Sequence, residues 1–365
     1  MKKIVTIFMF TVILLLNWTQ VKSQTPSQPK SIILFIGDGM GVSQITAAVM
    51  MGVGDNFLRF TNGGLSVTRS SRSWLTDSAA SATALASGKR TYIKAIGVDD
   101  DRVPLKNIVE IARGYGMSTG LVATSSITHA TPASFAAHVE WRGDEMEIAR
   151  QLSESNVNVI IGGGRKYFLP KKENGARKDN RNLLNEMAGR GFKVAYNMDD
   201  LFNLNFEKVE NLIALLDHNA INKKEHPEQN LSDMTDVAIK ILSKNKNGFF
   251  LMVEGSQIDW ESHDNEYEKM LFQMKDFNDA LGIGLDYLES NNDILILVTA
   301  DHETGGLSLH QGTDKTSNFN PKWASRGHTG EFVPILSAGA GSELFGGILN
   351  IAEIGEILIE LLAHR

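Results

Sequence analysis

The chain contains no cysteine among its 365 residues. This absence excludes a disulfide framework, a thiol nucleophile, thiolate ligands for zinc and a lipid anchor on an N-terminal cysteine. An exported protein of this composition would rely on its apolar core, on bound metals or on contacts between subunits. Hydrophobic residues make up 42% of the chain and charged residues 22%, which is typical of a globular protein.

The sequence also lacks an excess of positive charge. Its formal net charge is −7, and the only charged residues in 1–23 are lysines, so the rest of the chain is more acidic still. An acidic surface argues against nucleic acid as a specific partner and against an anionic membrane. It does not argue against an anionic substrate, because a bound metal ion dominates the field around it.

No apolar run of transmembrane length occurs beyond the N-terminus. There, Lys2 and Lys3 precede an apolar stretch at residues 4–16, and Val21-Lys22-Ser23 offers a small-residue cleavage site. This pattern predicts a signal peptide at residues 1–23 and an exported protein, periplasmic or secreted, without a stable membrane anchor. An uncleaved anchor is the alternative, although the run is short for a membrane span.

Six short apolar runs recur along the sequence, and each stops at a polar or glycine-rich cluster. They cover residues 31–36, 119–123, 157–161, 249–253, 294–298 and 333–337. Continuous runs of this length are typical of strands buried on both faces. Helices are expected between them, at residues 103–115, 146–153, 231–244, 266–290 and 351–363. The alternation predicts an α/β fold of three layers, with helices on both faces of a mostly parallel central sheet.

We expect residues 24–365 to form a single domain with two surface insertions. The segment at about 170–247 is rich in lysine, asparagine and glutamate, and we interpret it as helices and surface excursions. A separate second domain there is the alternative. Residues 305–327 form another polar excursion, which we expect to roof the functional site.

Nine side chains of metal-binding type lie beside or just beyond the apolar runs, where open α/β sheets carry their functional residues. They are Asp38, His129, Thr131, Glu254, Asp259, His263, Asp301, His302 and His328. Alone, Asp38 is best explained as a helix cap, whereas His302 fits an ordinary partly buried histidine as well as it fits a ligand. Together, oxygen and nitrogen ligands without sulfur favour catalytic Zn²⁺ and Mg²⁺, and they are too many for one ion.

The stretch WLTDSAASATALASGKR at residues 74–90 allows two interpretations. Asp77 followed by small residues is typical of a capped helix that packs closely against a sheet. The same arrangement places Ser78 at a helix N-terminus, where free backbone N–H groups can bind a phosphate. The local sequence does not decide between an ordinary helix start and a nucleophile.

Six motifs, taken in order, resemble those of the alkaline phosphatase family. They are FIGDGMG, LTDSAASATALASGKR, HATPASFAAHVEWR, VEGSQIDWESHDN, VTADHETGG and GHTGEFVP. The resemblance extends from residue 33 to residue 347. It implies the three-layer fold of that family and metal-dependent hydrolysis of small phosphate monoesters through a phosphoserine. It further implies a broad substrate range, an alkaline pH optimum and a homodimer.

The resemblance also implies a role for each matched residue. Ser78 would be the nucleophile, Arg142 would bind the phosphate, and Asp77 would orient Arg142. The metal ligands fall into three sets, two for zinc and one for a third ion that is usually magnesium. These sets are Asp259, His263 and His328; Asp38, Asp301 and His302; and Asp38, Thr131 and Glu254.

Two positions depart from the best-known enterobacterial members of the family. Those have Asp and Lys where this chain has His129 and Trp260, which we expect to lie at the substrate-binding site. The lost lysine removes one phosphate contact, so phosphate binding would be looser and product release faster. His129 leaves the third ion open between Mg²⁺ and Zn²⁺, because imidazole favours zinc.

Other functions make different predictions for the same residues. A sulfatase would need x-Pro-x-Arg after its nucleophile, whereas Ala79-Ala80-Ser81-Ala82 follow Ser78. Diesterases generally lack an arginine for the second anionic oxygen, so Arg142 favours monoesters. A secreted metal-binding protein with a degenerate site would have lost ligands, and none of the positions named above is lost.

Overall fold

The structure is a computed structural model that describes residues 28–311 and 319–363. The predicted signal peptide therefore lies outside the described residues. Ten strands form one sheet, in the order β14-β2-β13-β8-β1-β7-β3-β4-β6-β5. Of these ten, β13 alone runs against its neighbours β2 and β8, so the sheet is mostly parallel, as predicted.

The strands of the main sheet are short and mostly buried. Their bounds are β1 Ser31–Gly37, β2 Asn62–Val67, β3 Ser118–Ser126, β4 Val159–Gly163, β5 Lys193–Ala195, β6 Leu212–Leu215, β7 Phe249–Gly255, β8 Ile294–Thr299, β13 Val333–Gly339 and β14 Gly347–Asn350. Two small antiparallel pairs stand apart from it. They are β9 (Glu303–Thr304) with β12 (His328–Thr329), and β10 (Leu307–Gln311) with β11 (Phe319–Trp323).

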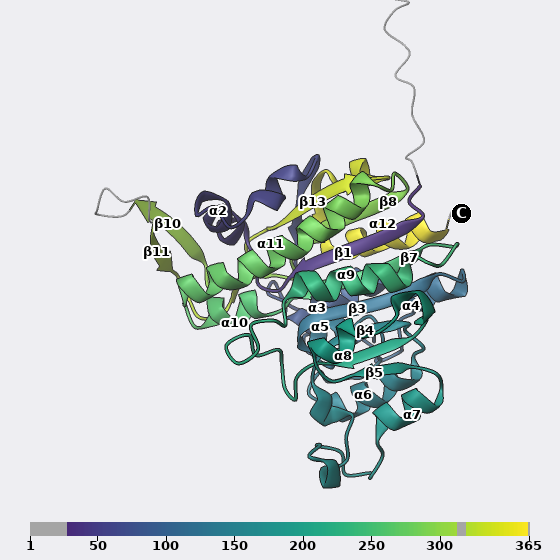
Figure 1. The fold of residues 1–365 in the computed structure, drawn as a ribbon. Helices are drawn as coiled ribbons and strands as arrows, with labels where there is room; N and C mark the ends of the chain where they lie inside the picture. Colours follow the sequence, from purple (N-terminus) through teal and green to yellow (C-terminus); the bar gives the residue numbers. More distant parts are fainter. Residues whose placement is uncertain (1–27, 312–318, 364–365) are drawn as a thin grey trace, which may run out of the picture.

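Helices cover both faces of the sheet, which gives the predicted three layers (Figure 1). The α-helices are α2 Val42–Met50, α3 Ser78–Ser87, α4 Ile108–Gly114, α5 Ala130–Ala133, α6 Glu145–Glu154, α7 Leu183–Gly189, α8 Met198–Phe202, α9 Leu231–Leu242, α10 Gln257–His263, α11 Tyr267–Glu289 and α12 Ile351–Ala363. The 3₁₀ helices are η1 Asp55–Arg59, η2 Arg165–Tyr167, η3 Lys171–Glu173, η4 Phe206–Lys208 and η5 Ser342–Phe345. Among the described residues, no helix combines the length and apolar character needed to cross a bilayer.

The central strand β1 is covered on both faces, which explains why its sequence is apolar throughout and does not alternate between apolar and polar residues. Ile32, Leu34 and Ile36 pack into the core under α3, α4 and α12. Ile33 and Phe35 pack into the opposite core under α2, α9 and α11. Successive side chains of a strand point to opposite faces, so a strand covered on both sides needs apolar residues at every position.

The expected helix at residues 103–115 is shorter than predicted. It begins at Ile108, because Asn107 caps it. The Asn107 side chain accepts a hydrogen bond from the Glu110 backbone N–H, and the Glu110 carboxylate accepts one from the Asn107 N–H. This reciprocal pair is a capping box, and Val98 pairs with Pro104 in an isolated bridge just before it.

The segment at 170–247 is more than a surface insertion. It supplies β5 and β6 at one edge of the main sheet, and α9, which packs against α11. The expectation of surface excursions was wrong here because β5 and β6 are only three and four residues long. Runs this short do not stand out from the polar residues around them.

The second expected insertion is a two-stranded arm. The β10–β11 pair extends outward beyond the ends of α10 and α11 (Figure 1). Residues 312–318, within the predicted roof, lie outside the described residues. The base of the arm matters more for the site, because β12 pairs there with β9 and places His328 opposite Thr304.

Candidate active site and metal centre

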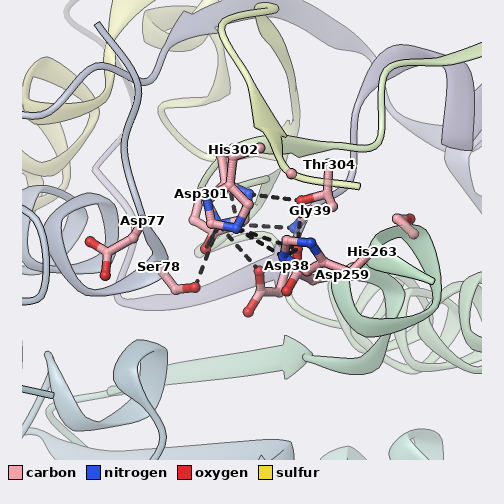
Figure 2. A network of polar contacts seen from close by, with 12 residues as sticks. Asp38, Gly39, Asp77, Ser78, Asp259, His263, Asp301, His302 and Thr304 are labelled. Carbon is pink, nitrogen blue, oxygen red and sulfur yellow. Dashed lines mark hydrogen bonds and ion pairs between the residues drawn. The ribbon is translucent and has the colours of Figure 1, made fainter. Parts of the chain in front are cut away.

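The carboxyl ends of β8, β1, β7 and β3, which are neighbours in the sheet, bring together acidic and imidazole side chains. Asp38 follows β1, Glu254 lies near the end of β7, and Asp301 and His302 follow β8. All four side chains are completely buried. Buried ionisable groups are costly unless a counter-charge or a metal compensates them. Figure 2 shows the network that Asp38, Asp301 and His302 form with residues of α3 and α10.

Asp259, His263 and His328 form the outer group of this network. His263 Nδ1 lies 2.5 Å from the Arg326 carbonyl and His328 Nδ1 lies 2.9 Å from the Thr76 carbonyl. A carbonyl can only accept, so each Nδ1 donates a ring proton, and each Nε2 is left facing the other members of the group as a possible metal ligand. The two Nε2 atoms are 3.2 Å apart and lie 3.3 and 3.8 Å from Asp259 Oδ1. Acceptors that face one another in this way fit a shared cation.

Asp38, Asp301 and His302 form the inner group. Thr304 donates its hydroxyl proton to Asp259 Oδ1 at 2.5 Å, so the same hydroxyl must accept from His302 Nδ1 at 3.2 Å. Burial, helped by His328, lowers the pKa of His302 to about 3, which leaves the ring neutral and Nε2 unprotonated. That nitrogen faces Asp301 Oδ2 at 3.2 Å and Asp38 Oδ1 at 3.6 Å. A bare nitrogen and two carboxylate oxygens held this close together suit a shared cation.

The third group lies between Asp38, Glu254 and His129, which offer ligand atoms within 4.8 Å of one another. Glu254 Oε2 accepts hydrogen bonds from the hydroxyls of Ser256, at 2.6 Å, and Ser125, at 3.2 Å. Burial raises the pKa of Glu254 to about 7, although the hydroxyl donors oppose that rise. Burial, with Arg142 nearby, lowers the pKa of His129 to about 3.

The polar atoms left without hydrogen bonds are a test of whether these groups suit metal ions. Among the described residues, buried atoms without a partner include six from the three groups. They are Asp38 Oδ1, Asp38 Oδ2, His129 Nδ1, Thr131 Oγ1, Glu254 Oε1 and Asp301 Oδ2. Buried polar atoms are normally paired, and the five oxygens among these six atoms are of the kind that Zn²⁺ and Mg²⁺ bind. The residues therefore fit divalent cations.

Ser78 is the first residue of α3, and its side chain is buried beside the inner group. Ser78 Oγ lies 3.4 Å from His302 Nε2. Figure 2 shows the Ser78 hydroxyl pointing toward this network and the Asp77 carboxylate pointing away from it. Helix α3 consists mainly of Ala, Ser and Thr and is buried along almost its whole length, so the small side chains let it pack closely on α12 and α5.

Asp77 has two functions at once. It caps α3 by accepting from the Ala80 N–H at 3.0 Å, and the Lys94 N–H also donates to it. Its Oδ2 accepts from Arg142 Nη1 at 3.0 Å. Sequence reasoning replaced the capping role with the orienting one, whereas the structure shows both.

Arg142 is held from two sides, by Asp77 and by His129, whose Nε2 lies 3.0 Å from Arg142 Nη2. A guanidinium can only donate, so His129 Nε2 accepts and the ring proton sits on Nδ1. Trp260 packs edge-on against His129, with ring centroids 6.0 Å apart. The structure thus brings Arg142, His129 and Trp260 together, as it does the predicted metal ligands.

Sequence reasoning missed Thr304. Its hydroxyl joins the outer and inner groups by contacting Asp259 and His302 together. The only signal was its position in VTADHETGG, two residues after the predicted ligand His302. Without the structure, nothing distinguished Thr304 from any other threonine of a strand.

Comparisons with known proteins agree with this geometry. Residues 29–322 match the family described as alkaline phosphatase. The chain is 31% identical to alkaline phosphatase 4 of Bacillus subtilis (strain 168), with 93% of this chain and 90% of that protein covered.

Solved structures are similar over most of the chain. The alkaline phosphatase of the Antarctic bacterium TAB5 superposes with a TM-score of 0.86 and 39% identity, covering 93% of this chain and all of that one. A variant of that enzyme, with one histidine replaced by aspartate and Mg bound in its M3 site, superposes with a TM-score of 0.85 and 38% identity over the same share of each chain.

Proposed function

The chain belongs to the alkaline phosphatase family and is a metal-dependent enzyme that hydrolyses phosphate monoesters, and from this premise we propose that Ser78 is its nucleophile. Ser78 Oγ bonds to phosphorus while the bond from phosphorus to the alcohol oxygen breaks. Water then cleaves the resulting phosphoserine and releases inorganic phosphate. The observation that carries the proposal is the Ser78 hydroxyl beside the inner group, 3.4 Å from His302 Nε2.

The N-terminus of α3 supports this role for Ser78. The first N–H groups of a helix have no partner within the helix, and they carry the positive end of its dipole. A phosphate at Ser78 would meet these donors. The Asp77 side chain takes only the Ala80 N–H among them, so capping does not block the anion site.

Arg142 is proposed to bind two non-bridging oxygens of the phosphate. A planar guanidinium matches two oxygens at once, which a lysine ammonium does not. Asp77 and His129 hold the guanidinium by two different nitrogens, at 3.0 Å each. A monoester dianion offers this site three non-bridging oxygens and two negative charges, whereas a diester offers two non-bridging oxygens that share one charge, so the arginine favours the monoester.

Three metal ions are proposed, two Zn²⁺ and one Mg²⁺. The outer group would hold one zinc through Asp259, His263 and His328, and the inner group the second through Asp38, Asp301 and His302. Asp38, Thr131 and Glu254 would hold the third ion. When bound, such ions supply positive charge that stabilises the serine oxygen and the departing alcohol oxygen.

His129 bears on the identity of the third ion. While Arg142 donates to Nε2, the His129 Nδ1 carries a proton and cannot bind a metal. We propose that the oxygens of Asp38, Thr131 and Glu254 then select Mg²⁺, and that Zn²⁺ enters only when His129 releases Arg142. The TAB5 variant with aspartate in place of a histidine and Mg in its M3 site supports an effect of such a histidine on the third metal.

An alkaline pH optimum and a broad substrate range are part of the proposal. Ligand carboxylates and imidazoles must be unprotonated to bind metals, and burial raises the pKa of Asp38, Asp301 and Glu254, which favours activity at higher pH. The residues above all bind phosphate or metals, so many alcohols would be accepted. The proposal also includes export of the protein to the periplasm or the medium. It further includes a homodimer, which analytical ultracentrifugation would test.

The test compares hydrolysis of a phosphate monoester, a phosphate diester and a sulfate ester by the metal-loaded protein. The monoester should be hydrolysed fastest, and metal analysis should find about two zincs and one magnesium per chain. Faster hydrolysis of the diester or the sulfate ester would refute the substrate assignment. A single bound metal would refute the proposed metal content.

A further inference from the structure

A cleft of about 910 Å³ lies beside the phosphate site, between the loop at residues 217–225 and the helices α10 and α11. Trp260, Phe272 and Gln273 lie on its helical wall. Its volume is within the range of pockets that bind small organic molecules. None of the metal ligands lines it, so the reaction described above does not account for it.

Buried contacts fix the loop that forms the other wall. The Lys223 ammonium makes an ion pair with the Asp276 carboxylate of α11, and both side chains are buried. The other Asp276 oxygen accepts from the Leu231 N–H at 3.0 Å. Gln257 of α10 donates to the Ile221 carbonyl at 2.7 Å. The cleft is therefore formed before a ligand arrives, so little conformational entropy is lost on binding.

Trp260 connects the cleft to the phosphate site. It lines the cleft, and its ring packs against His129 on the other side. His129 in turn contacts Arg142, the proposed phosphate ligand. Two side chains in contact, His129 and Trp260, therefore separate Arg142 from the cleft.

The side chains on the cleft walls determine which alcohol portions would bind there most tightly. Phe272 is 54% exposed although it is a large apolar residue on a helix, and the Lys223 ammonium lies 5.7 Å from its ring centroid. Exposed aromatic rings bind flat heteroaromatic rings by stacking. Asn222 and Gln273 add amide groups to the walls, which can both donate and accept hydrogen bonds.

The charges on the walls argue against a charged ligand. Lys223 is already neutralised by Asp276. The other ionisable side chains are two lysines and four acids, namely Lys224, Lys269, Asp217, Glu225, Glu261 and Glu268. Mixed charges of this kind offer no concentrated field for a second phosphate or for a cationic group.

We infer that this cleft binds the nucleoside portion of nucleoside monophosphates, with the base stacked on Phe272 and Trp260 next to it on the path from the phosphate. The inference rests on the proposed function, because it names a substrate class for the same phosphate site. It adds selectivity for neutral, heteroaromatic alcohols to an enzyme that otherwise recognises phosphate.

The experiment compares adenosine 5′-monophosphate with glycerol 1-phosphate. Both are esters of primary alcohols, so the bond that breaks is similar. Phe272→Ala should lower kcat/KM for the nucleotide about fivefold, the lower end for loss of one base–aromatic stack, and leave glycerol phosphate unchanged. Phe202→Ala, at a phenylalanine of α8 that is 50% exposed and outside the cleft, is the matched control and should change neither. An equal loss for both substrates, or no loss with Phe272→Ala, would overturn the inference.

Adenosine without phosphate separates this inference from the proposed function. Its binding, followed by ligand-observed NMR, should be weaker with Phe272→Ala than with the wild-type chain or Phe202→Ala. If the chain hydrolysed neither ester but bound adenosine in this way, the proposed function would fail and the cleft assignment would stand. If it hydrolysed both esters but showed no adenosine binding, the cleft assignment would fail alone.

Discussion

Removing bound metals should make the stability of the chain fall as the pH rises from 5 to 8, and Glu254 offers the clearest test. Burial raises its pKa from the ordinary value of 4.5 to about 7. Its stabilising contribution in the folded, metal-free chain is therefore complete below about pH 4.5 and is lost as the pH rises through 7. The difference between these pKa values corresponds to about 3 kcal/mol of unfolding free energy.

The matched variants are Glu254→Gln and Glu207→Gln. A glutamine at 254 resembles the protonated acid and keeps an oxygen that can accept from Ser256 and Ser125, so its stability should not depend on this titration. At about 2 °C per kcal/mol, the Tm of the metal-free wild-type chain should fall about 6 °C relative to Glu254→Gln between pH 5 and pH 8. Glu207 is exposed on η4, and its variant should follow the wild type.

Thermal unfolding in the presence of a chelator measures this difference. Restoring Mg²⁺ and Zn²⁺ at pH 8 should raise the Tm of the wild-type chain more than that of Glu254→Gln, because the metal compensates the ionised carboxylate. Parallel Tm profiles for the wild type and Glu254→Gln across this pH range would refute the argument that burial raises the pKa of the Glu254 carboxyl.

Three further predictions concern residues around the site. Arg142→Lys should weaken competitive inhibition by inorganic phosphate about tenfold, since a two-point contact is lost. Asp77→Asn, which can still cap α3, should weaken this inhibition less. Unchanged inhibition in both variants would contradict the role of the Asp77–Arg142 contact in orienting the arginine. Thr304→Val should lower zinc affinity about tenfold to a hundredfold, as loss of a residue that orients metal ligands does. Thr304→Ser should retain the zinc affinity of the wild type. Equal zinc affinity of Thr304→Val and the wild type in chelator competition would rule out an orienting role for the Thr304 hydroxyl. His129→Asp should increase the magnesium retained per chain during dialysis, because a carboxylate suits Mg²⁺ better than imidazole, and an unchanged metal content would contradict the account of the third ion.

The sequence predicted the layers and the edge of the sheet that carries the site because both follow from local patterns. A strand buried on both faces is apolar throughout, as β1 shows, and parallel strands end at a common edge. Asp38 and Asp301 could be placed there from their positions after apolar runs. That β8, β1, β7 and β3 are neighbours could not be deduced, because strand order depends on long-range packing.

Other features depend on contacts that sequence patterns do not show. Thr304 joins two metal groups because the fold brings it against Asp259, a residue 45 positions earlier in the chain. The short strand β6 pairs with β4, and the still shorter β5 pairs with β6 at the edge of the sheet. The cleft beside Trp260 exists because Lys223 and Asp276, 53 positions apart, meet as a buried pair.

The most direct test of the account is to identify the residue that carries phosphate during turnover. The metal-loaded wild-type chain should be mixed with a monoester, quenched with acid within the first turnovers, digested and analysed by mass spectrometry. The account predicts phosphate on Ser78, and neither phosphorylation nor more than slow residual hydrolysis with Ser78→Ala. Phosphate on another residue, or near-full activity of Ser78→Ala, would contradict it.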